Sequence, residues 1–218
     1  MVTMMDLNKY LIELDEYLDL TELELVEKEF ANSVNKVPKK YINTFRANGY
    51  PLEKGVTYRD GVNTIYLRDL KPEYEKIHNY SMVDKSIYWE DFPVYDYFPI
   101  LKKLISKTPF KDIGRILIVY SKDIIDSIIH RDHISVECCN EFIWLRSNKN
   151  KRIFVMINGE RIYIKGYSCW FDSREFHGSE VTEKYSMGVR IDGEFTSDFR
   201  EKLFGKNSKW KSLPIMDI

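Results

Sequence analysis

Six short apolar segments between residues 115 and 191 place the strongest constraint on how this chain can fold. Each is rich in β-branched or aromatic residues, the types that favour strands. In order they are RILIVY at 115–120, FIWL at 142–145, RIFVMI at 152–157, RIYI at 161–164, SCWF at 168–171 and YSMGVRI at 185–191. Asn158-Gly159 separates two of these segments and is a strong signal for a two-residue hairpin. Short strands at such close spacing, without an internal repeat, predict a β-sandwich or barrel.

The N-terminal part has the spacing of helices instead. Apolar residues recur at three- and four-residue steps from Leu7 to Leu18, which predicts an amphipathic helix over this stretch. Thr21 with Glu24 three residues later has the form of a capping box, so a second helix is expected to follow and to end before Pro38. We expect these helices to pack against the β-rich part.

Two further elements are expected before residue 108. The pair Asp60-Gly61 stands between the apolar segments 56–58 and 64–67, which predicts a hairpin. The segment 96–105 has a helical pattern, and Pro99 is acceptable in the first turn of a helix. The sequence therefore predicts one domain over 1–218, mainly β with N-terminal helices (α+β). Within it, 1–108 would form a buttress of helices and loops, and 109–200 the β core.

Composition narrows the class of protein. The 33 Lys and Arg residues nearly balance 34 Asp and Glu residues, so no bulk basicity favours nucleic acid as a partner. The 3 cysteines, with two of them adjacent, do not resemble a disulfide framework and favour a reducing compartment. The start of the chain lacks a basic, then apolar, leader, and no apolar run approaches the length of a membrane span. We expect a cytoplasmic protein, and the oligomeric state is left open.

Two of the 4 histidines, together with one aspartate, suggest a metal site. His130 and Asp132 are two residues apart, so on an extended strand their side chains leave the same face. His177 follows 47 residues later (130 to 177), enough chain for several short strands that return it to the same place. Two imidazoles and one carboxylate form the facial triad of non-haem iron(II) oxygenases. His133 would project from the opposite face and is interpreted as structural, and His78 is given no role.

An arginine is expected to complete this site. Arg190 stands on the last predicted strand, 13 residues after His177 (177 to 190), and its planar fork suits a carboxylate. Arg146, at the end of EFIWLR, is a rival because it too could point inward. Trp144 and Tyr120 could line the same pocket, but core packing is the favoured interpretation of both.

These motifs, in this order, resemble a known superfamily. The segment FPILKKLISKTPFKDIGRILIVYSKDIIDSIIHRDH, then EFIWLR, WFDSREFHGSEV and VRIDGEF, is similar to the Fe(II)/2-oxoglutarate dioxygenases, and within them to the aspartyl/asparaginyl β-hydroxylase-like branch. The likeness implies a double-stranded β-helix, a jelly-roll or cupin-like barrel. It also implies Fe(II), 2-oxoglutarate and O₂ as cofactor and co-substrates. His130, Asp132 and His177 would then be the metal ligands, and Arg190 would bind the oxoacid.

The resemblance further implies hydroxylation of a C–H bond in an amino acid, a peptidyl side chain or a small metabolite. In the β-hydroxylase proper the carboxylate of the triad is missing, whereas Asp132 supplies it here. Two alternatives remain. A non-catalytic β-helix module would bind a ligand without turnover. A metal-dependent hydrolase of the metallo-β-lactamase type would need a histidine where Ile128 stands, so this reading is disfavoured.

Overall fold

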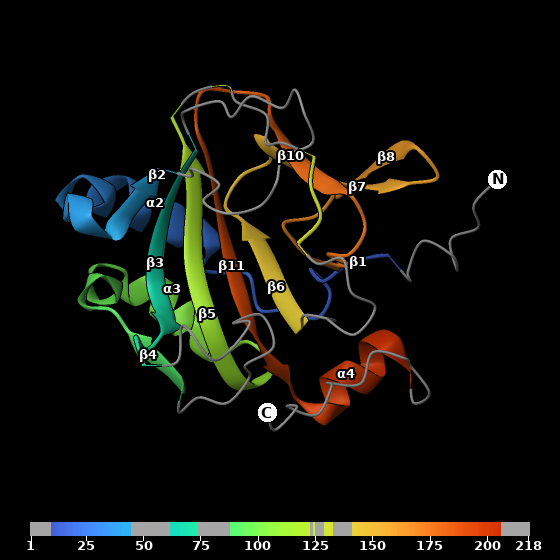
Figure 1. Ribbon diagram of the computed structural model, residues 1–218, viewed down its shortest axis with the longest axis horizontal. Helices are drawn as coiled ribbons and strands as arrows, with labels where there is room; N and C mark the ends of the chain where they lie inside the picture. The colour runs from blue at the N-terminus through green and yellow to red at the C-terminus, as the bar shows by residue number, and fades with distance from the viewer. Residues whose placement is uncertain are drawn as a thin grey trace.

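The computed structural model describes residues 10–44, 62–73, 88–122, 124, 129–132 and 141–205. Within these residues the chain forms two antiparallel sheets (Figure 1). The larger, here called the main sheet, has the strand order β1-β9-β6-β11-β5-β3-β2, with β4 paired to β3. Its strands are β1 (Leu11–Glu13), β2 (Ile42–Thr44), β3 (Val62–Leu70), β4 (Trp89–Asp91), β5 (Phe110–Ser121), β6 (Glu141–Arg146), β9 (Ser168–Phe171) and β11 (Ser186–Phe195).

The smaller sheet has the order β10-β7-β8, with β7 at Lys151–Ile157, β8 at Glu160–Tyr163 and β10 at His177–Val181. The β7–β8 hairpin turns at Asn158 and Gly159, whose φ angles are 53° and 84°. Positive φ at both positions is what the favoured two-residue hairpin turn requires, and asparagine and glycine tolerate it best. The hairpin predicted from this pair is confirmed.

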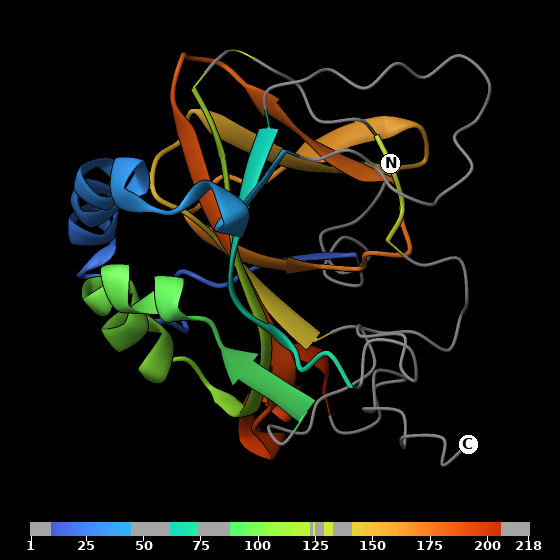
Figure 2. The same ribbon diagram turned by 60° about the vertical axis from the view of Figure 1, so that its left-hand side comes forward.

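Helices cover the opposite side of the main sheet from the small sheet (Figure 2). They are α2 (Leu23–Ser33) and α3 (Pro99–Ser106), while α4 (Ser197–Phe204) follows β11, and short 3₁₀ turns lie at Val34–Lys36, Lys39–Tyr41 and Pro93–Tyr97. Phe30 of α2 contacts Phe98, with ring centroids 6.1 Å apart, and Tyr120 of β5, at 5.1 Å. Tyr120 therefore belongs to the helix-packed core, which we call the outer face of the main sheet; the inner face looks toward β7 and β10.

The predicted mainly β chain with N-terminal helices is confirmed, as are all six predicted strands. The helix expected at 96–105 is present as α3, with Pro99 in its first turn. The N-terminal part does more than buttress, because it also supplies β1, β2, β3 and β4 to the main sheet. Closure of the two sheets into a double-stranded β-helix stays a prediction.

The amphipathic helix predicted from Leu7 to Leu18 is wrong in its described part. Residues Leu11–Glu13 form β1, which pairs with β9 so that Leu11 lies opposite Phe171. Asp15 then accepts hydrogen bonds from the backbone N–H groups of Tyr167 and Ser168. Pairing with the distant strand β9 at the edge of the main sheet thus decides the conformation of this segment, although the spacing of its leucines also suits a helix.

Two other expectations concern helix ends and a hairpin. The second predicted helix is confirmed as α2, but its capping box is wrong, because the N-cap is Glu22 and makes no side-chain capping hydrogen bond. Thr21 instead donates its hydroxyl to Asp19. The hairpin at Asp60-Gly61 lies outside the described residues. Among the described helices, none is long and apolar enough to cross a membrane.

Candidate metal centre

Three side chains predicted as metal ligands converge where the segment 130–132 meets the start of β10. One ligand-type atom from each of His130, Asp132 and His177 can be chosen so that all lie within 4.8 Å of one another. Nε2 of His130 is 3.4 Å from Oδ1 of Asp132, and Nε2 of His177 is 3.5 Å from the same oxygen. Two imidazole nitrogens and one carboxylate oxygen at this spacing can bind a single ion on one face and leave its other positions open.

Backbone pairing brings these residues together. His177 is the first residue of β10 and lies opposite Val155 of β7. His130 joins it through an isolated antiparallel bridge with reciprocal N–H to carbonyl bonds of 3.0 and 2.9 Å. The backbone N–H of Asp132 donates to the carbonyl of Ser173 at 3.0 Å. The segment 130–132 is therefore an extended edge beside β10, the geometry in which residues two apart share a face.

His177 is held in one orientation. Its side chain is buried, and Nδ1 lies 2.9 Å from the carbonyl oxygen of Glu175. A carbonyl only accepts, so Nδ1 carries the proton in the neutral ring and Nε2 keeps its lone pair toward Asp132. The ring of Phe171 packs against His177 at 4.7 Å between centroids. Such support fixes the tautomer and orientation of a metal-binding histidine.

A chain of alternating charges extends inward from Asp132. Its Oδ2 accepts from Nη1 of Arg190 at 2.5 Å, and Nε of Arg190 donates to Asp192 at 2.8 Å. The other oxygen of Asp192 accepts from Nε of Arg115 at 2.9 Å. Burial opposes ionisation of Asp132, but attraction to the charged Arg190 outweighs it and holds its pKa well below the usual range. The carboxylate is therefore charged at neutral pH, as a metal ligand must be.

The two arginines predicted from sequence have different surroundings. Arg190 retains one buried nitrogen, Nη2, that has no hydrogen-bond partner among the described residues. Burial lowers the pKa of this guanidinium, but the two flanking carboxylates outweigh that effect and raise it, so Arg190 stays charged. Arg146 instead donates to four backbone carbonyl oxygens, those of Lys151, Ile164, Lys165 and Gly166. Arg146 thereby joins β6 to the β8–β9 connection.

Some residues of this network were not found by sequence reasoning. Asp192 stands two residues after Arg190, so strand alternation could have placed both on one face. Arg115 begins a predicted strand, and nothing local marks its partner. Lys151 is buried at the start of β7, and burial lowers its pKa to about 8. His78, His133, Cys138 and Cys139 lie outside the described residues.

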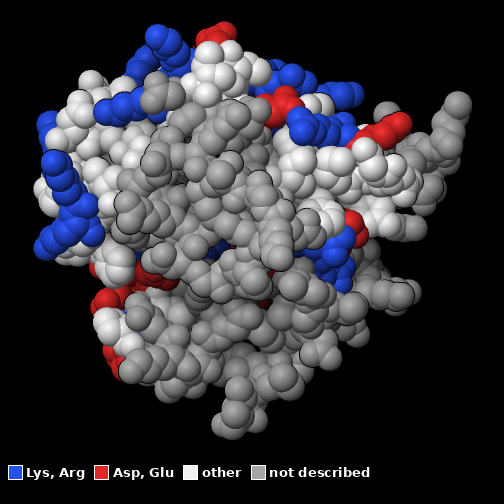
Figure 3. Space-filling view, turned by 45° about the horizontal axis from the view of Figure 1, so that its top comes forward, with Lys and Arg blue, Asp and Glu red and all other residues white. Residues whose placement is uncertain are grey.

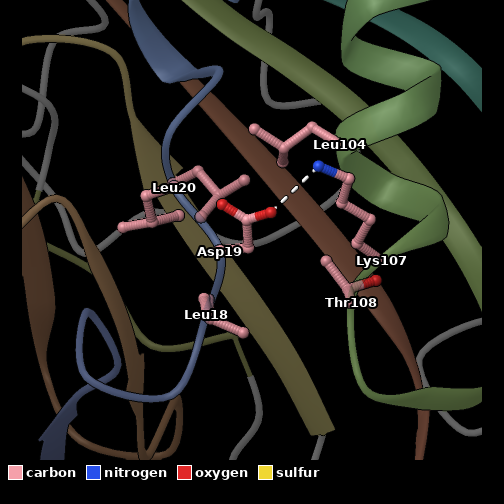
Figure 4. Close-up of a pocket in the computed structure, with 7 residues that line it drawn as sticks. Leu18, Asp19, Leu20, Leu104, Lys107 and Thr108 are labelled. Atoms are coloured by element: carbon pink, nitrogen blue, oxygen red, sulfur yellow. Dashed lines mark hydrogen bonds and ion pairs between the residues drawn. The ribbon is translucent and has the colours of Figure 1, made fainter.

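The surface and one small cavity add little to this site. On the face drawn in Figure 3, the described basic side chains lie in separate groups toward the margins. A cavity of about 10 Å³ lies between the segment 18–20 and α3, with Asp19 and Lys107 paired at 2.9 Å in its wall (Figure 4). It has room for about one water molecule and lies on the outer face, away from the candidate metal centre.

The chain is similar in structure to several solved oxygenases, at low sequence identity. One is an oxidoreductase of the 2OG-Fe(II) oxygenase family from Burkholderia pseudomallei, 11% identical, with TM-score 0.45, covering 84% of this chain and 82% of that one. A Pseudomonas putida prolyl-4-hydroxylase is 8% identical, with TM-score 0.48 and coverages of 86% and 94%.

A third is a Trichoplax adhaerens prolyl hydroxylase solved with a hypoxia inducible factor peptide, 11% identical, with TM-score 0.47 and coverages of 89% and 87%. No protein-family model matches the chain, and no curated protein matches it. The functional argument below therefore rests on the residues of this chain.

Proposed function

We propose that this chain is a non-haem iron(II) oxygenase that uses 2-oxoglutarate as co-substrate and hydroxylates a C–H bond. The reaction would be R–H plus 2-oxoglutarate plus O₂ giving R–OH plus succinate plus CO₂, with one oxygen atom entering each organic product. The substrate class we propose is an amino acid, a peptidyl side chain or a small metabolite. The fold we propose for this site is the double-stranded β-helix, and the branch is that of the aspartyl/asparaginyl β-hydroxylases.

One observation carries the proposal: His130, Asp132 and His177 converge, although 47 residues separate the two histidines (130 to 177). A structural zinc site is closed by four ligands, usually including cysteine. Here the described residues supply two nitrogens and one oxygen, the set that leaves positions open for an oxoacid and oxygen. The donor set thus fits iron(II) better than it fits a structural ion.

The protein would contribute binding, orientation and charge. Iron(II), when bound, supplies the activation of oxygen and the decarboxylation of the oxoacid. The hydrogen bond to Glu175 would hold Nε2 of His177 toward the ion, and Arg190 would hold Asp132 ionised and fix its second oxygen. Phe171, buried against His177, would exclude water from that side. Each of these contacts is made by the chain before any ligand binds.

An oxoacid also needs a cation, and the two candidates can be compared. Nη2 of Arg190 is buried without a partner among the described residues, which fits a site that a carboxylate would complete. Arg146 already has four carbonyl acceptors. Of these two arginines, Arg190 is therefore the one that could meet an oxoacid, and Arg146 has a structural role.

The test is an assay of metal-dependent succinate formation. Purified protein loaded with iron(II) is expected to convert 2-oxoglutarate to succinate in air, slowly alone and faster when a substrate screen finds the correct C–H donor. His130→Ala, Asp132→Ala and His177→Ala should each abolish this turnover. His133→Ala is the matched control. Its position one residue after Asp132 on an extended segment predicts a side chain on the other face.

The alternatives predict different results. A non-catalytic module would bind the ion or a ligand without forming succinate under any condition. A hydrolase would retain zinc through chelation and show no oxoacid turnover. Either result, or loss of metal in His133→Ala with retention in His130→Ala, would contradict the proposal.

A further inference from the structure

The inner face of the main sheet carries several buried polar atoms that lack hydrogen-bond partners. Register places their residues on one face, because Thr64 lies opposite Val119, Val119 opposite Gly188, and Arg190 opposite Trp144. Ser186 shares this face with Gly188 and Arg190 by strand alternation. The atoms without a partner among the described residues are Oγ1 of Thr64, Nε1 of Trp144, Oγ of Ser186 and Nη2 of Arg190. All four can donate hydrogen bonds, and buried donors normally find an acceptor.

Gly188 allows one of these donors to approach the backbone of β11 closely. A Cβ atom built on Gly188 would lie 3.1 Å from Nε1 and from Cζ2 of Trp144. The indole N–H therefore lies beside the one position on this stretch of β11 that has no side chain. A larger residue at this position would press on the indole, so Gly188 allows the N–H of Trp144 to lie close to β11 among the other donors.

Lys151 faces these donors from the small sheet. It lies opposite Val181, as Val155 lies opposite His177, so strand alternation puts Lys151 and His177 on one face. Its ammonium lies 5.6 Å from the centre of the Trp144 ring. The side chain is buried, with 4% exposure, and no carboxylate of the described residues pairs with its ammonium. The other buried cations on this face, Arg146 and Arg190, have carbonyl or carboxylate partners.

An unpaired buried ammonium is costly to the fold. A cation–π contact offsets only part of this cost. Burial alone lowers the pKa of Lys151, with no nearby acid acting against it. Within the described part of the chain, Lys151 and the neighbouring donors all lack an acceptor. An anionic ligand would supply one.

The position of Lys151 relative to the candidate metal centre defines which part of a ligand it meets. Lys151 and Val155 are four residues apart on β7, about 13 Å along the strand, and Val155 is the partner of His177. Arg190, by contrast, directly contacts Asp132. Arg190 thus lies at the metal-binding end of the site and Lys151 at the far end.

We propose that Lys151, with the indole N–H of Trp144, binds the distal carboxylate of the oxoacid, while Arg190 acts at the metal-binding end. The proposal rests on the proposed function, and it moves the distal contact from the last strand of the main sheet to the first residue of β7. A five-carbon diacid has its second carboxylate two methylenes beyond the keto acid group, which reaches away from the ion. Thr64 and Ser186 provide further donors on the same face.

The experiment measures binding rather than turnover. Calorimetry under anaerobic conditions, with iron(II)-loaded protein, compares 2-oxoglutarate with 2-oxopentanoate, which has a methyl group in place of the distal carboxylate. Wild type should prefer 2-oxoglutarate. Lys151→Met should weaken 2-oxoglutarate binding about 30- to 1,000-fold, as expected when one partner of a buried charge pair is removed, and leave 2-oxopentanoate binding within about threefold. Lys149→Met, at an exposed lysine in the turn that precedes β7, is the matched control.

The outcomes separate this inference from the proposed function. If wild type binds iron(II) but neither oxoacid, the proposed function fails. If wild type prefers 2-oxoglutarate and Lys151→Met keeps that preference while Arg190→Met loses it, the distal contact belongs to Arg190 and the inference is overturned. Trp144→Phe, which removes only the indole N–H among hydrogen-bonding groups, provides a second variant should Lys151→Met fold poorly. It should lower the preference about threefold to tenfold, and an unchanged preference would remove Trp144 from the site.

Discussion

Lys151→Met should make the ligand-free protein more stable. Burial lowers the pKa of Lys151 from 10.5 to about 8, which corresponds to about 3 kcal/mol at 1.36 kcal/mol per pKa unit. Methionine has a similar length and carries no charge, so it removes this cost. It also loses the contact with the Trp144 ring, worth about 0.5–2 kcal/mol. We expect the free energy of unfolding at pH 7 to rise by about 1–3 kcal/mol.

The effect of Lys151→Met on stability should depend on pH, whereas a change in packing alone would not. Between about pH 8 and 10.5 the unfolded chain holds a proton on Lys151 that the folded chain has released. The free energy of unfolding of wild type therefore rises relative to that of the variant as the pH rises through this window. The advantage of Lys151→Met should be complete below about pH 8 and largely gone by pH 10.5.

Urea unfolding of metal-free protein at several pH values measures both effects. Lys149→Met should change the free energy of unfolding by less than about 0.5 kcal/mol at every pH, as exposed substitutions usually do. A Lys151→Met variant that is less stable than wild type at pH 7, or whose advantage is the same at pH 7 and pH 10, would refute the reasoning. Greater stability combined with weaker oxoacid binding would mark Lys151 as a residue kept for function.

Three further predictions concern the surrounding structure. Asp132→Asn should destabilise metal-free protein by about 2–3 kcal/mol at pH 7, because Arg190 loses one of two carboxylate partners. In urea unfolding this difference should shrink as the pH falls below 3.8, since the lowered pKa of Asp132 contributes stability only above its folded value. Arg146→Met should lower the free energy of unfolding by about 3 kcal/mol through loss of four hydrogen bonds to carbonyls, with iron(II) affinity of the folded protein unchanged by calorimetry. Gly193→Ala should cost about 1–3 kcal/mol in thermal unfolding, because its Cβ would overlap the carbonyl oxygen of Asp112, and equal stability would contradict that packing.

Local signals in the sequence were sufficient for the elements whose conformation is decided locally. The β-rich segments became strands because β-branched and aromatic residues fit a pleated, half-buried surface. Asn158-Gly159 specified its turn because both positions need positive φ. The helix through Phe30 was also predicted, although its start was not, because Thr21 donates to Asp19 instead of capping α2.

The N-terminal strand shows where local reasoning fails. The spacing of leucines suited a helix, yet Leu11 pairs with Phe171 and Asp15 accepts from the backbone of Tyr167. Both partners are more than 150 residues away in sequence, and Asp15 and Tyr167 are 152 residues apart. No window along the chain contains that information.

The sequence by itself determined which residue types could form the site. His130 and Asp132, two apart, and His177 after several strands supplied a ligand set with the chemistry of iron(II), and the structure brings them within 4.8 Å of one another. Arg190 was chosen because a guanidinium suits a carboxylate. Those choices depended on the chemistry of side chains and on strand alternation, both of which are readable without coordinates.

Only the tertiary structure decided what each charged group meets. Arg190 is bound to Asp132, 58 residues earlier in the chain. One of the guanidinium donors that were predicted to bind the oxoacid therefore binds a predicted metal ligand instead. Arg146 is bound to backbone carbonyls. Lys151, which nothing in the sequence distinguishes from the other lysines, is buried with neither a carboxylate nor a carbonyl partner among the described residues. The physical reason is that desolvation and pairing depend on distance and burial, which folding sets between strands and sequence order does not.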